Sequence, residues 1–466
     1  MRFKIQVVIE DEQGITKIQE VLNLEKSNSS NDVVGLSLLE SKEVLKKLQE
    51  SIVLEQSESY TRQHKCCPLC AQPRTSKGYH LILYRTLFGV VSIPNLRLNQ
   101  CSCHESLTAT VSVLNDWLPE HTSPELQYIE TKLGALISYG QTAKLLHDVL
   151  PVSPTENATT IRRHLCGAAK RQEEELKDTT EYLAGIPRDW AKLPKPDKPF
   201  TVGIDGGYVR DWDHKKTNFE VITGKSLSKS KSPMRFGFVQ TVEENSRRRL
   251  MHFLTEQGMQ ANQQITFLSD GADNLRDLQY RMYPESEHVL DWFHITMRIT
   301  VLNQFAKGLI ISDPEKGKEI QEKLTSIKWY LWHGNVKNAL ENLEDCYVIC
   351  IYEEDDKWIK YANKAKLIKY LEEMNTYIKN NQHLIPNYGE KWRSGETITT
   401  AFVESTVNEV IAKRMVKKQQ MQWTPKGAHY LIQARTAVLN NELEKHFELW
   451  YPGQHFGDQV VHKKAA

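Results

Sequence analysis

The sequence lacks the features that mark membrane and secreted proteins. No apolar run approaches the roughly 20 residues that a helix needs to cross a bilayer. The first residues, Met1 to Ile9, alternate polar and apolar side chains, and they lack the apolar stretch and small-residue cleavage site of a signal peptide. We therefore expect a cytoplasmic protein with no membrane partner.

The chain also lacks an excess of charge of either sign. It has 60 Lys and Arg residues against 59 Asp and Glu residues, a formal net charge of +1. Any binding to nucleic acid must therefore come from local basic patches, because the overall charge supplies no attraction. With 466 residues, 40% of them hydrophobic, the chain is long enough for several domains and at least one large core.

Cysteine is scarce and unevenly placed. There are eight cysteines, and five of them lie between positions 66 and 103. This crowding favours a metal site in a reducing compartment over a disulfide framework. The knuckle Cys67-Pro68-Leu69-Cys70 precedes two strand-like runs, and Cys101-Ser102-Cys103 follows them. We predict a zinc ribbon in which a structural Zn²⁺ is bound by four thiolates, those of Cys67, Cys70, Cys101 and Cys103.

The second cysteine pair departs from the usual spacing, and this leaves alternatives open. Because the pair is Cys-x-Cys, Cys66 or His104 is a possible replacement ligand. Free cysteines or a transient redox pair are the other interpretations of the cluster.

The segments around this module read as further small modules. A β-hairpin over the first 25 residues and an amphipathic helix near 38–54 come before it. Three helices follow, at 125–136, 140–150 and 155–172, with a turn through Pro151 and Pro154. This pattern indicates a helix-turn-helix whose last helix reads DNA, and an ordinary helical connector is the alternative. Its donors to bases and phosphates would be Thr159, Thr160, Arg162 and Arg163.

Beyond a proline-bearing linker the pattern changes to strands and helices in alternation. Strand-like runs are at 200–209, 219–223, 236–242, 265–268 and 288–290, with helical runs at 246–258, 274–283 and 292–309. Three successive strands followed by αβαβα is the order of an RNase H-like fold. We predict a multidomain α/β protein with these parts: hairpin and helix 1–60, zinc ribbon 61–120, helix-turn-helix 121–185, linker 186–199, RNase H-like catalytic domain 200–311 and 395–440, all-helical insertion 312–394, and tail 441–466.

Three carboxylates carry the expected chemistry. Asp205 interrupts an apolar strand, Asp270 ends another, and Glu404 lies on a strong helix at 399–415. A buried carboxylate must be paired, hydrogen-bonded or bound to metal. Three of them around two Mg²⁺ or Mn²⁺ ions suit phosphodiester chemistry, in which one metal activates water or a 3′-hydroxyl and the other stabilises the leaving oxygen. The alternative is that the two aspartates cap turns and Glu404 is an ordinary surface residue.

At these residues the chain resembles bacterial insertion-sequence transposases of the ISKra type and, more distantly, Mutator and hAT transposases. The resemblance spans most of the chain, and it is carried by Gly203-Ile204-Asp205-Gly206-Gly207-Tyr208-Val209-Arg210, Ser269-Asp270-Gly271-Ala272, Asp291-Trp292-Phe293-His294, and Val403-Glu404-Ser405 with Asn408. It implies a catalytic Asp, Asp, Glu trio with a helical insertion before the Glu. It also implies double-stranded DNA at element ends and target, a homodimer or higher oligomer on that DNA, and a location at the nucleoid.

Residues near the trio call for separate interpretations. The pair Asp291 and His294 resembles an Asp-x-x-His element of the Mutator and hAT groups, which implies a catalytic contact of His294 with the scissile phosphate. A helix cap at Asp291 beside a packed His294 is the alternative. Asp291 is also the acid most able to replace Glu404. Asp273 and Glu409 lie close in sequence to the trio, and we expect them to point elsewhere.

Basic residues give candidate phosphate tracks. The track after the Glu404 helix comprises Lys413, Arg414, Lys417 and Lys418. Others are Lys225, Lys229, Lys231 and Arg247 to Arg249, and a solvated charged face is the alternative for each. The sequence thus predicts a transposase that binds terminal inverted repeats and catalyses Mg²⁺-dependent hydrolysis and strand transfer. A non-catalytic DNA-binding regulator derived from a transposase, or another RNase H-like nuclease such as a junction resolvase, are the competing functions.

Overall fold

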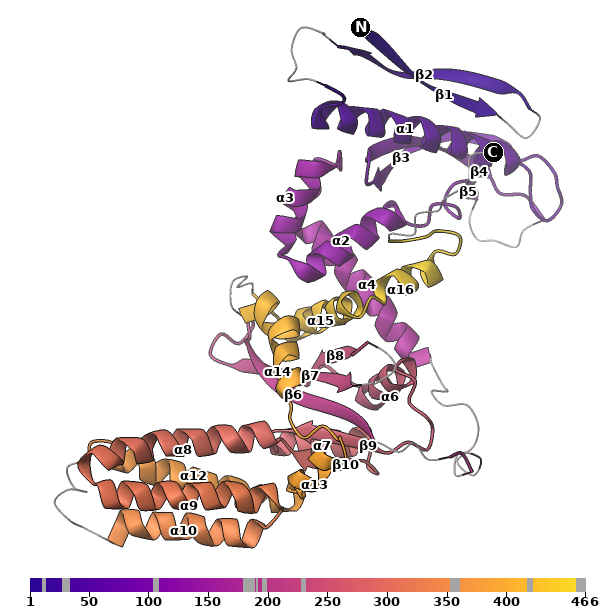
Figure 1. Ribbon diagram of the computed structural model, residues 1–466. Coiled ribbons are helices and arrows are strands. Elements are labelled where there is room, and N and C mark those ends of the chain that lie inside the picture. Colours follow the sequence, from indigo (N-terminus) through magenta and orange to yellow (C-terminus); the bar gives the residue numbers. More distant parts are fainter. Residues whose placement is uncertain are drawn as a thin grey trace. The chain divides into compact units, whose positions relative to one another are not determined.

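A computed structural model gives a mixed α/β architecture (Figure 1). It describes residues 1–10, 14–26, 34–103, 109–178, 189, 192–194, 199–227, 232–352, 361–416 and 422–457. The chain divides into two compact units, one of residues 1–168 with 441–466 and one of residues 169–440. Within the described residues, no helix is both long enough and apolar enough to span a membrane.

The first unit begins with the expected hairpin and helix. Strands β1 (Arg2–Glu10) and β2 (Thr16–Glu25) pair antiparallel, and α1 (Leu38–Gln63) follows. A capping box starts the helix, because the Ser37 hydroxyl accepts from the Glu40 N–H at 3.2 Å and the Glu40 carboxylate accepts from the Ser37 N–H at 2.8 Å. Strands β3 (Ser76–Thr86), β4 (Gly89–Asn99) and β5 (Thr110–Ser112) form an antiparallel sheet. Val53 of α1 packs on Ile93 of this sheet, so the helix and the ribbon share a core.

Three further helices of the first unit match the predicted helical runs. These are α2 (Pro124–Leu136), α3 (Tyr139–Val149) and α4, which runs from Ala158 to Asp178. Serine side chains cap α2 and α3, and the Asn157 side chain accepts from the first N–H groups of α4. The part of α4 after Ala168 belongs to the second unit. Helix α16 (Leu443–Trp450) lies in the stretch expected to be a tail, and it packs on α2 through Phe447 and Tyr128, whose ring centroids are 5.5 Å apart.

The second unit is built on a five-stranded sheet in the order β10-β9-β6-β7-β8. Strands β6 (Phe200–Arg210), β7 (Asn218–Leu227) and β8 (Arg235–Val239) form an antiparallel meander. Strands β9 (Ile265–Ser269) and β10 (Glu287–Leu290) then run parallel to β6. One face of the sheet is covered by α6 (Ser246–Glu256) and α7 (Asp273–Met282), which bury Leu250, Leu254 and Leu278 against it.

Helices of the insertion cover the other face at β9 and β10. They are α8 (Trp292–Ser312), α9 (Pro314–Trp332), α10 (Val336–Tyr352), α12 (Lys364–Asn381), the short η2 (Gln382–Leu384) and α13 (Tyr388–Arg393). Their hydrophobic core continues into the sheet through Leu268, Val289 and Leu290. The described insertion is all-helical, as the sequence predicts, and α8 is already part of its core.

The chain returns to the sheet through α14 (Ala401–Val407), a π-helix η3 (Asn408–Val416) and α15 (Pro425–Leu439). The sequence predicts one continuous helix over 399–415, but the structure changes from α to π geometry at Asn408. A π-turn widens the helix and is frequent at functional sites. In this turn the guanidinium of Arg435 on α15 donates to the Glu409 carbonyl at 2.6 and 2.9 Å.

Candidate functional site

Two glycines allow a helix to lie directly on strand β6. A Cβ added at Gly203 would stand 2.1 Å from Val403 Cγ2, and one added at Gly207 would stand 2.7 Å from Ile411 Cδ1. Both distances are too short for any side chain, so α14 and η3 rest on the bare backbone of this face. Asp205 lies midway between the two glycines, and alternation along the strand places it on the same face.

Asp270 reaches the same face from the neighbouring strand. Gly203 is paired with Leu268 in the parallel register, so the alternation that continues past Leu268 brings Asp270 to the side of Asp205. The pKa of Asp205 is raised, first by burial and then by the negative charges of Asp270 and Asp291. A hydrogen bond from the Gly206 N–H at 2.7 Å and the nearby His294 act in the opposite direction. Asp205 within β6, Asp270 after β9 and Asp291 after β10 thus lie close enough for their charges to interact.

Glu404 is placed differently from these aspartates. It lies on α14 one position after the buried Val403, and it is exposed. Its N–H bonds to the Thr400 carbonyl at 3.1 Å in the first turn of the helix. Asp205, Asp270 and Glu404 do not bring their carboxylate oxygens within 4.8 Å of one another. Among the described residues, only the four cysteines form a group of three or more possible metal ligands that close together. The structure brings Asp205 close to Asp270, whereas the side chain of Glu404 is exposed on α14.

Asp291 links the two ends of the insertion. Its fully buried carboxylate caps α8 by accepting from the Phe293 N–H at 2.8 Å. The same carboxylate accepts from the Thr400 N–H at 3.0 Å and from the Thr400 hydroxyl. His294 Nε2 lies 3.7 Å from Asp291 Oδ2, and the His294 side chain is 38% exposed. The cap interpretation of Asp291 therefore agrees with the structure. Its second partner, Thr400, could not be predicted from the sequence, because it lies 109 positions further along the chain.

The two nearby acids expected to point elsewhere are engaged by arginines. Glu409 accepts from Arg235 Nε at 2.7 Å, and Asp273 pairs with Arg276. Neither carboxylate is directed to Asp205.

The donor set at Asp205 and Asp270 fits a hard divalent cation. Carboxylate oxygens are the ligands that Mg²⁺ and Mn²⁺ take in proteins. Burial, followed by the negative charges of Asp270 and Asp291, raises the pKa of Asp205, and a cation at this position would offset that repulsion. The chemistry of Asp205 and Asp270 is thus compatible with a divalent cation, and Glu404 lies on the helix that covers this face.

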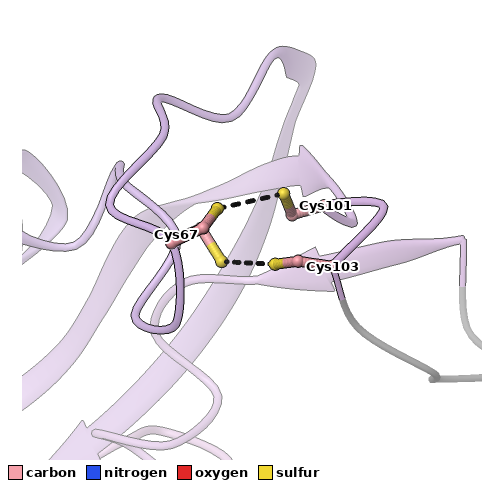
Figure 2. A group of neighbouring side chains, drawn as sticks. Cys67, Cys101 and Cys103 are labelled. Carbon is pink, nitrogen blue, oxygen red and sulfur yellow. Dashed lines mark hydrogen bonds between the residues drawn. The ribbon is translucent and has the colours of Figure 1, made fainter.

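The four predicted zinc ligands form a compact cluster (Figure 2). Cys67, Cys70, Cys101 and Cys103 have sulfur atoms that all lie within 4.8 Å of one another. Cys67 Sγ is 3.4 Å from Cys103 Sγ, and the same distance separates Cys70 Sγ from Cys101 Sγ. In the knuckle the Cys67 carbonyl accepts from the Ala71 N–H at 2.9 Å, and Ala71 has a φ of 56°. Four thiols gathered in this way can hold a structural metal such as zinc.

The alternative ligands of this cluster are placed less favourably. Cys66 precedes the knuckle, is exposed and is not one of the four. His104 lies outside the described residues. The cluster joins the chain after α1 to the loop that leaves β4, so a bound metal would fix both ends of the β3–β4 hairpin.

The residues expected to read DNA lie at the start of α4. Thr159, Arg162 and Arg163 are exposed, and Thr160 is half-buried. Asn157 Oδ1 accepts from the Thr159 and Thr160 N–H groups at 2.9 and 3.2 Å and so caps the helix. The side chains of Arg162 and Arg163 lie on the helix surface.

The phosphate track after the Glu404 helix is smaller than predicted. Lys413 is exposed, but Arg414 is fully buried, with its guanidinium 5.3 Å from the centre of the Trp423 ring. A phosphate contact by Arg414 is not supported by this placement, because the side chain packs inside the unit. Lys417 and Lys418 lie outside the described residues. Of the other tracks, Lys225 donates to the Phe402 carbonyl at 3.3 Å and so binds α14.

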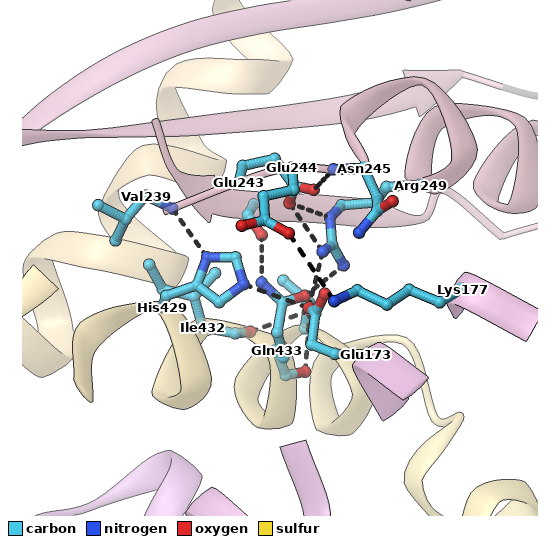
Figure 3. Close-up of polar contacts among 12 residues, drawn as sticks. Glu173, Lys177, Val239, Glu243, Glu244, Asn245, Arg249, His429, Ile432 and Gln433 are labelled. Atoms are coloured by element: carbon cyan, nitrogen blue, oxygen red, sulfur yellow. Dashed lines mark hydrogen bonds and ion pairs between the residues drawn. The ribbon is translucent and has the colours of Figure 1, made fainter. Parts of the chain in front are cut away.

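Arg249 is also engaged inside the protein (Figure 3). Its guanidinium lies 2.7 Å from both Glu173 and Glu243, and His429 Nε2 lies 3.2 Å from Glu173. Burial alone would raise the pKa of Glu173, but His429 and Arg249 lower it to about 2. This network joins the end of α4 to α6 and α15, so Arg249 is not a surface cation for DNA.

A second acid pair is buried among α2, α3 and α4 in the first unit. Glu130 is fully buried and bonds to His164 Nδ1. Glu156 is 4% exposed, and neither of its carboxyl oxygens has a hydrogen-bond partner. Burial, followed by the negative charge of Glu130, raises the pKa of Glu156 from 4.5 to about 7. This acid is therefore largely protonated just below neutral pH.

The raised pKa predicts that Glu156→Gln removes a pH-dependent loss of stability. Below pH 4.5, Glu156 is protonated in both the folded and the unfolded protein and does not lower the free energy of unfolding. As the pH rises through 7, ionisation of Glu156 in the buried site lowers the free energy of unfolding of the wild type. We expect the variant to be more stable than the wild type at pH 8, by about 2 kcal/mol, and closely similar at pH 4. Calorimetric unfolding at both pH values measures this, and an equal difference at the two would contradict it.

The chain thus carries a carboxylate site at one end of a sheet and a thiol site in a small ribbon. Function must be inferred from these residues themselves. Comparison with protein families and with curated proteins gives no match for this chain.

Proposed function

We propose that this chain is a DNA transposase of the DDE type, which binds the terminal inverted repeats of its element and catalyses Mg²⁺-dependent hydrolysis and strand transfer. The observation that carries the proposal is the proximity of Asp205, within β6, to Asp270, which follows the end of the neighbouring parallel strand β9, on the sheet face covered by the helix that bears Glu404. A meander of three strands followed by two strands parallel to the first is also the order of an RNase H-like domain. This order supports the proposal, although fold alone does not assign a reaction.

The chemistry assigned to the site needs no protein nucleophile. When bound, two Mg²⁺ or Mn²⁺ ions would activate the attacking water or 3′-hydroxyl and stabilise the leaving oxygen. Asp205 and Asp270 would hold the ions, with Glu404 completing the set from α14. In this proposal His294, half-exposed beside Asp291, would donate to a phosphate oxygen.

Other residues would hold the DNA. Arg162 and Arg163 on α4 and Lys413 on η3 are exposed cations for phosphate contacts, with Thr159 as a donor to base edges. The cysteine cluster would bind a structural Zn²⁺ and stiffen the ribbon. Because two element ends must be paired for transposition, we include a homodimer or higher oligomer on DNA, at the nucleoid, in the proposal.

One observation favours a second candidate, a non-catalytic DNA-binding regulator. Glu404 is exposed and stands apart from the two aspartates, as it would in a protein that kept the fold and lost the reaction. The two candidates differ in whether a divalent metal leads to cut DNA.

The test uses the purified full-length chain and a linear DNA that carries both flanks of its own reading frame. With Mg²⁺ or Mn²⁺ and a target plasmid, we expect nicks at the flank ends and products in which those ends are joined to the plasmid. Binding of the flanks without a nick under either metal would establish the regulator. Cuts that never lead to joined products would indicate another nuclease of this fold.

A further inference from the structure

Two tyrosines of the insertion donate hydrogen bonds to the main chain at the acidic strand ends. The Tyr377 hydroxyl on α12 donates to the carbonyl of Asp270 at 2.9 Å. The Tyr388 hydroxyl at the start of α13 donates to the carbonyl of Leu290, the residue before Asp291, at 2.7 Å. Each bond therefore holds the backbone at a carboxylate without using that carboxylate's own oxygens, which accept from the Ala272 N–H in Asp270 and from Phe293 and Thr400 in Asp291.

Tyr388 is enclosed so that its hydroxyl has a fixed direction. The side chain is fully buried, and its ring lies 4.9 Å from that of Trp292, which in turn is 5.1 Å from Trp332. The neighbouring Gly389 lets Trp332 approach, since a Cβ there would be 2.7 Å from the indole nitrogen. Aromatic packing thus presses the phenol against the end of β10, where an unpaired hydroxyl would be costly.

Tyr377 is held by its own set of contacts. The Arg298 guanidinium stacks 4.2 Å from the centre of its ring. One helical turn further on, Asn381 lies against the backbone after Asp270, because a Cβ at Gly271 would be 2.5 Å from Asn381 Oδ1. Gly271 has a φ of +82°, which favours glycine, so the turn after Asp270 is shaped to receive α12.

The core of the insertion is continuous with the sheet at the same place. Leu268, Val289 and Leu290 belong to the cluster that fills the helical bundle. At the rim of this contact, Lys391 donates to Glu287 at the start of β10, at 2.9 Å. The helices therefore pack on the ends of β9 and β10 and share one hydrophobic core with the sheet.

We propose that the helical insertion is a built-in support of the metal site, in which Tyr377 and Tyr388 are positioning residues that fix the main chain beneath Asp270 and Asp291. The inference rests on the proposed function, since Tyr377 supports Asp270, which would hold Mg²⁺, and Tyr388 supports Asp291, which joins the two ends of the insertion beside that site. Support of this kind matters because residues that orient metal ligands typically change metal affinity about 10- to 100-fold when they are altered.

The test compares Tyr377→Phe and Tyr388→Phe with a matched control in the full-length chain. The control is Tyr347→Phe, which removes a phenol bond of 2.8 Å to Glu372 inside the same bundle, away from the strand ends. Mn²⁺ binding is measured without DNA by electron paramagnetic resonance, with Asp205→Asn defining the signal of the site. We expect about tenfold weaker binding in each test variant and unchanged binding in the control.

A second measurement covers the possibility that Tyr388→Phe does not fold. In Tyr377→Phe, amide hydrogen exchange in residues 271–275 should be faster than in the wild type, whereas in Tyr347→Phe it should not. Folded test variants that bind Mn²⁺ as tightly as the wild type, with unchanged exchange, would overturn the support role alone. If Asp205→Asn leaves the wild-type Mn²⁺ signal intact, the metal site itself is wrong, and both proposals fail.

Discussion

Asp205→Asn is expected to lower the rate of Mg²⁺-dependent cleavage at element ends by at least about a thousandfold, because a catalytic metal supplies several kcal/mol of transition-state stabilisation and each 1.36 kcal/mol is worth a factor of ten. The amide keeps the shape of the side chain but removes the charge that binds the cation. Asp205 is the central acid of the site, between two glycines and beneath α14. The rate is measured as single-turnover nicking of an end-labelled flank fragment.

A matched control keeps this prediction specific. Asp273→Asn changes an acid three positions after Asp270 whose side chain is 87% exposed and pairs with Arg276. It should leave cleavage close to the wild-type rate. Both variants should bind flank DNA with wild-type affinity, because the residues proposed to contact DNA on α4 and η3 are untouched. Wild-type cleavage by purified Asp205→Asn would show that the carboxylate site is not the active site.

The second large effect is expected at the cysteine cluster. Purified chain should contain one zinc ion, and Cys67→Ser should contain none, since Cys67 is the buried ligand of the four. Structural zinc contributes roughly 10 kcal/mol or more to small modules that fold around it, so the variant ribbon should open. We expect fast proteolysis between residues 64 and 112, together with zinc loss measured by elemental analysis.

Cys66→Ser is the control for this experiment. Cys66 is adjacent to Cys67 but exposed and outside the quartet, so its variant should retain zinc and resist protease. Removal of zinc from the wild type by a chelator should reproduce the Cys67→Ser digestion pattern. A wild-type protein without bound metal would contradict the assignment.

Short-range signals predicted much of the fold. Alternation and apolar runs place β6, β9 and the helix between them, and the predicted starts of α2 and α3 lie within one residue of the observed ones. The cysteine cluster could be predicted because two closely spaced pairs stand on either side of a predicted hairpin, although the spacing left Cys66 and His104 open as ligands.

What the sequence could not predict depends on partners far along the chain. Arg414 reads as a surface cation in a basic run, yet Trp423 and the packing of α15 bury it. The π-turn at Asn408 has no local mark in a sequence that favours a regular helix. Glu404 is the least predictable of the three acids, because its position depends on how the chain returns from the insertion.

That return has a consequence for how much the chain can vary in length. Two hydrogen bonds join Asp291 to Thr400, and the Trp292 N–H donates to the Ile398 carbonyl at 3.1 Å. The two ends of the helical insertion therefore lie side by side. The sheet and α14 are therefore connected as if Thr400 directly followed Asp291 in the chain. Turns could be added or removed at the far ends of α9 and α10 without moving Glu404, provided that this junction and the two tyrosines beside it stay in place.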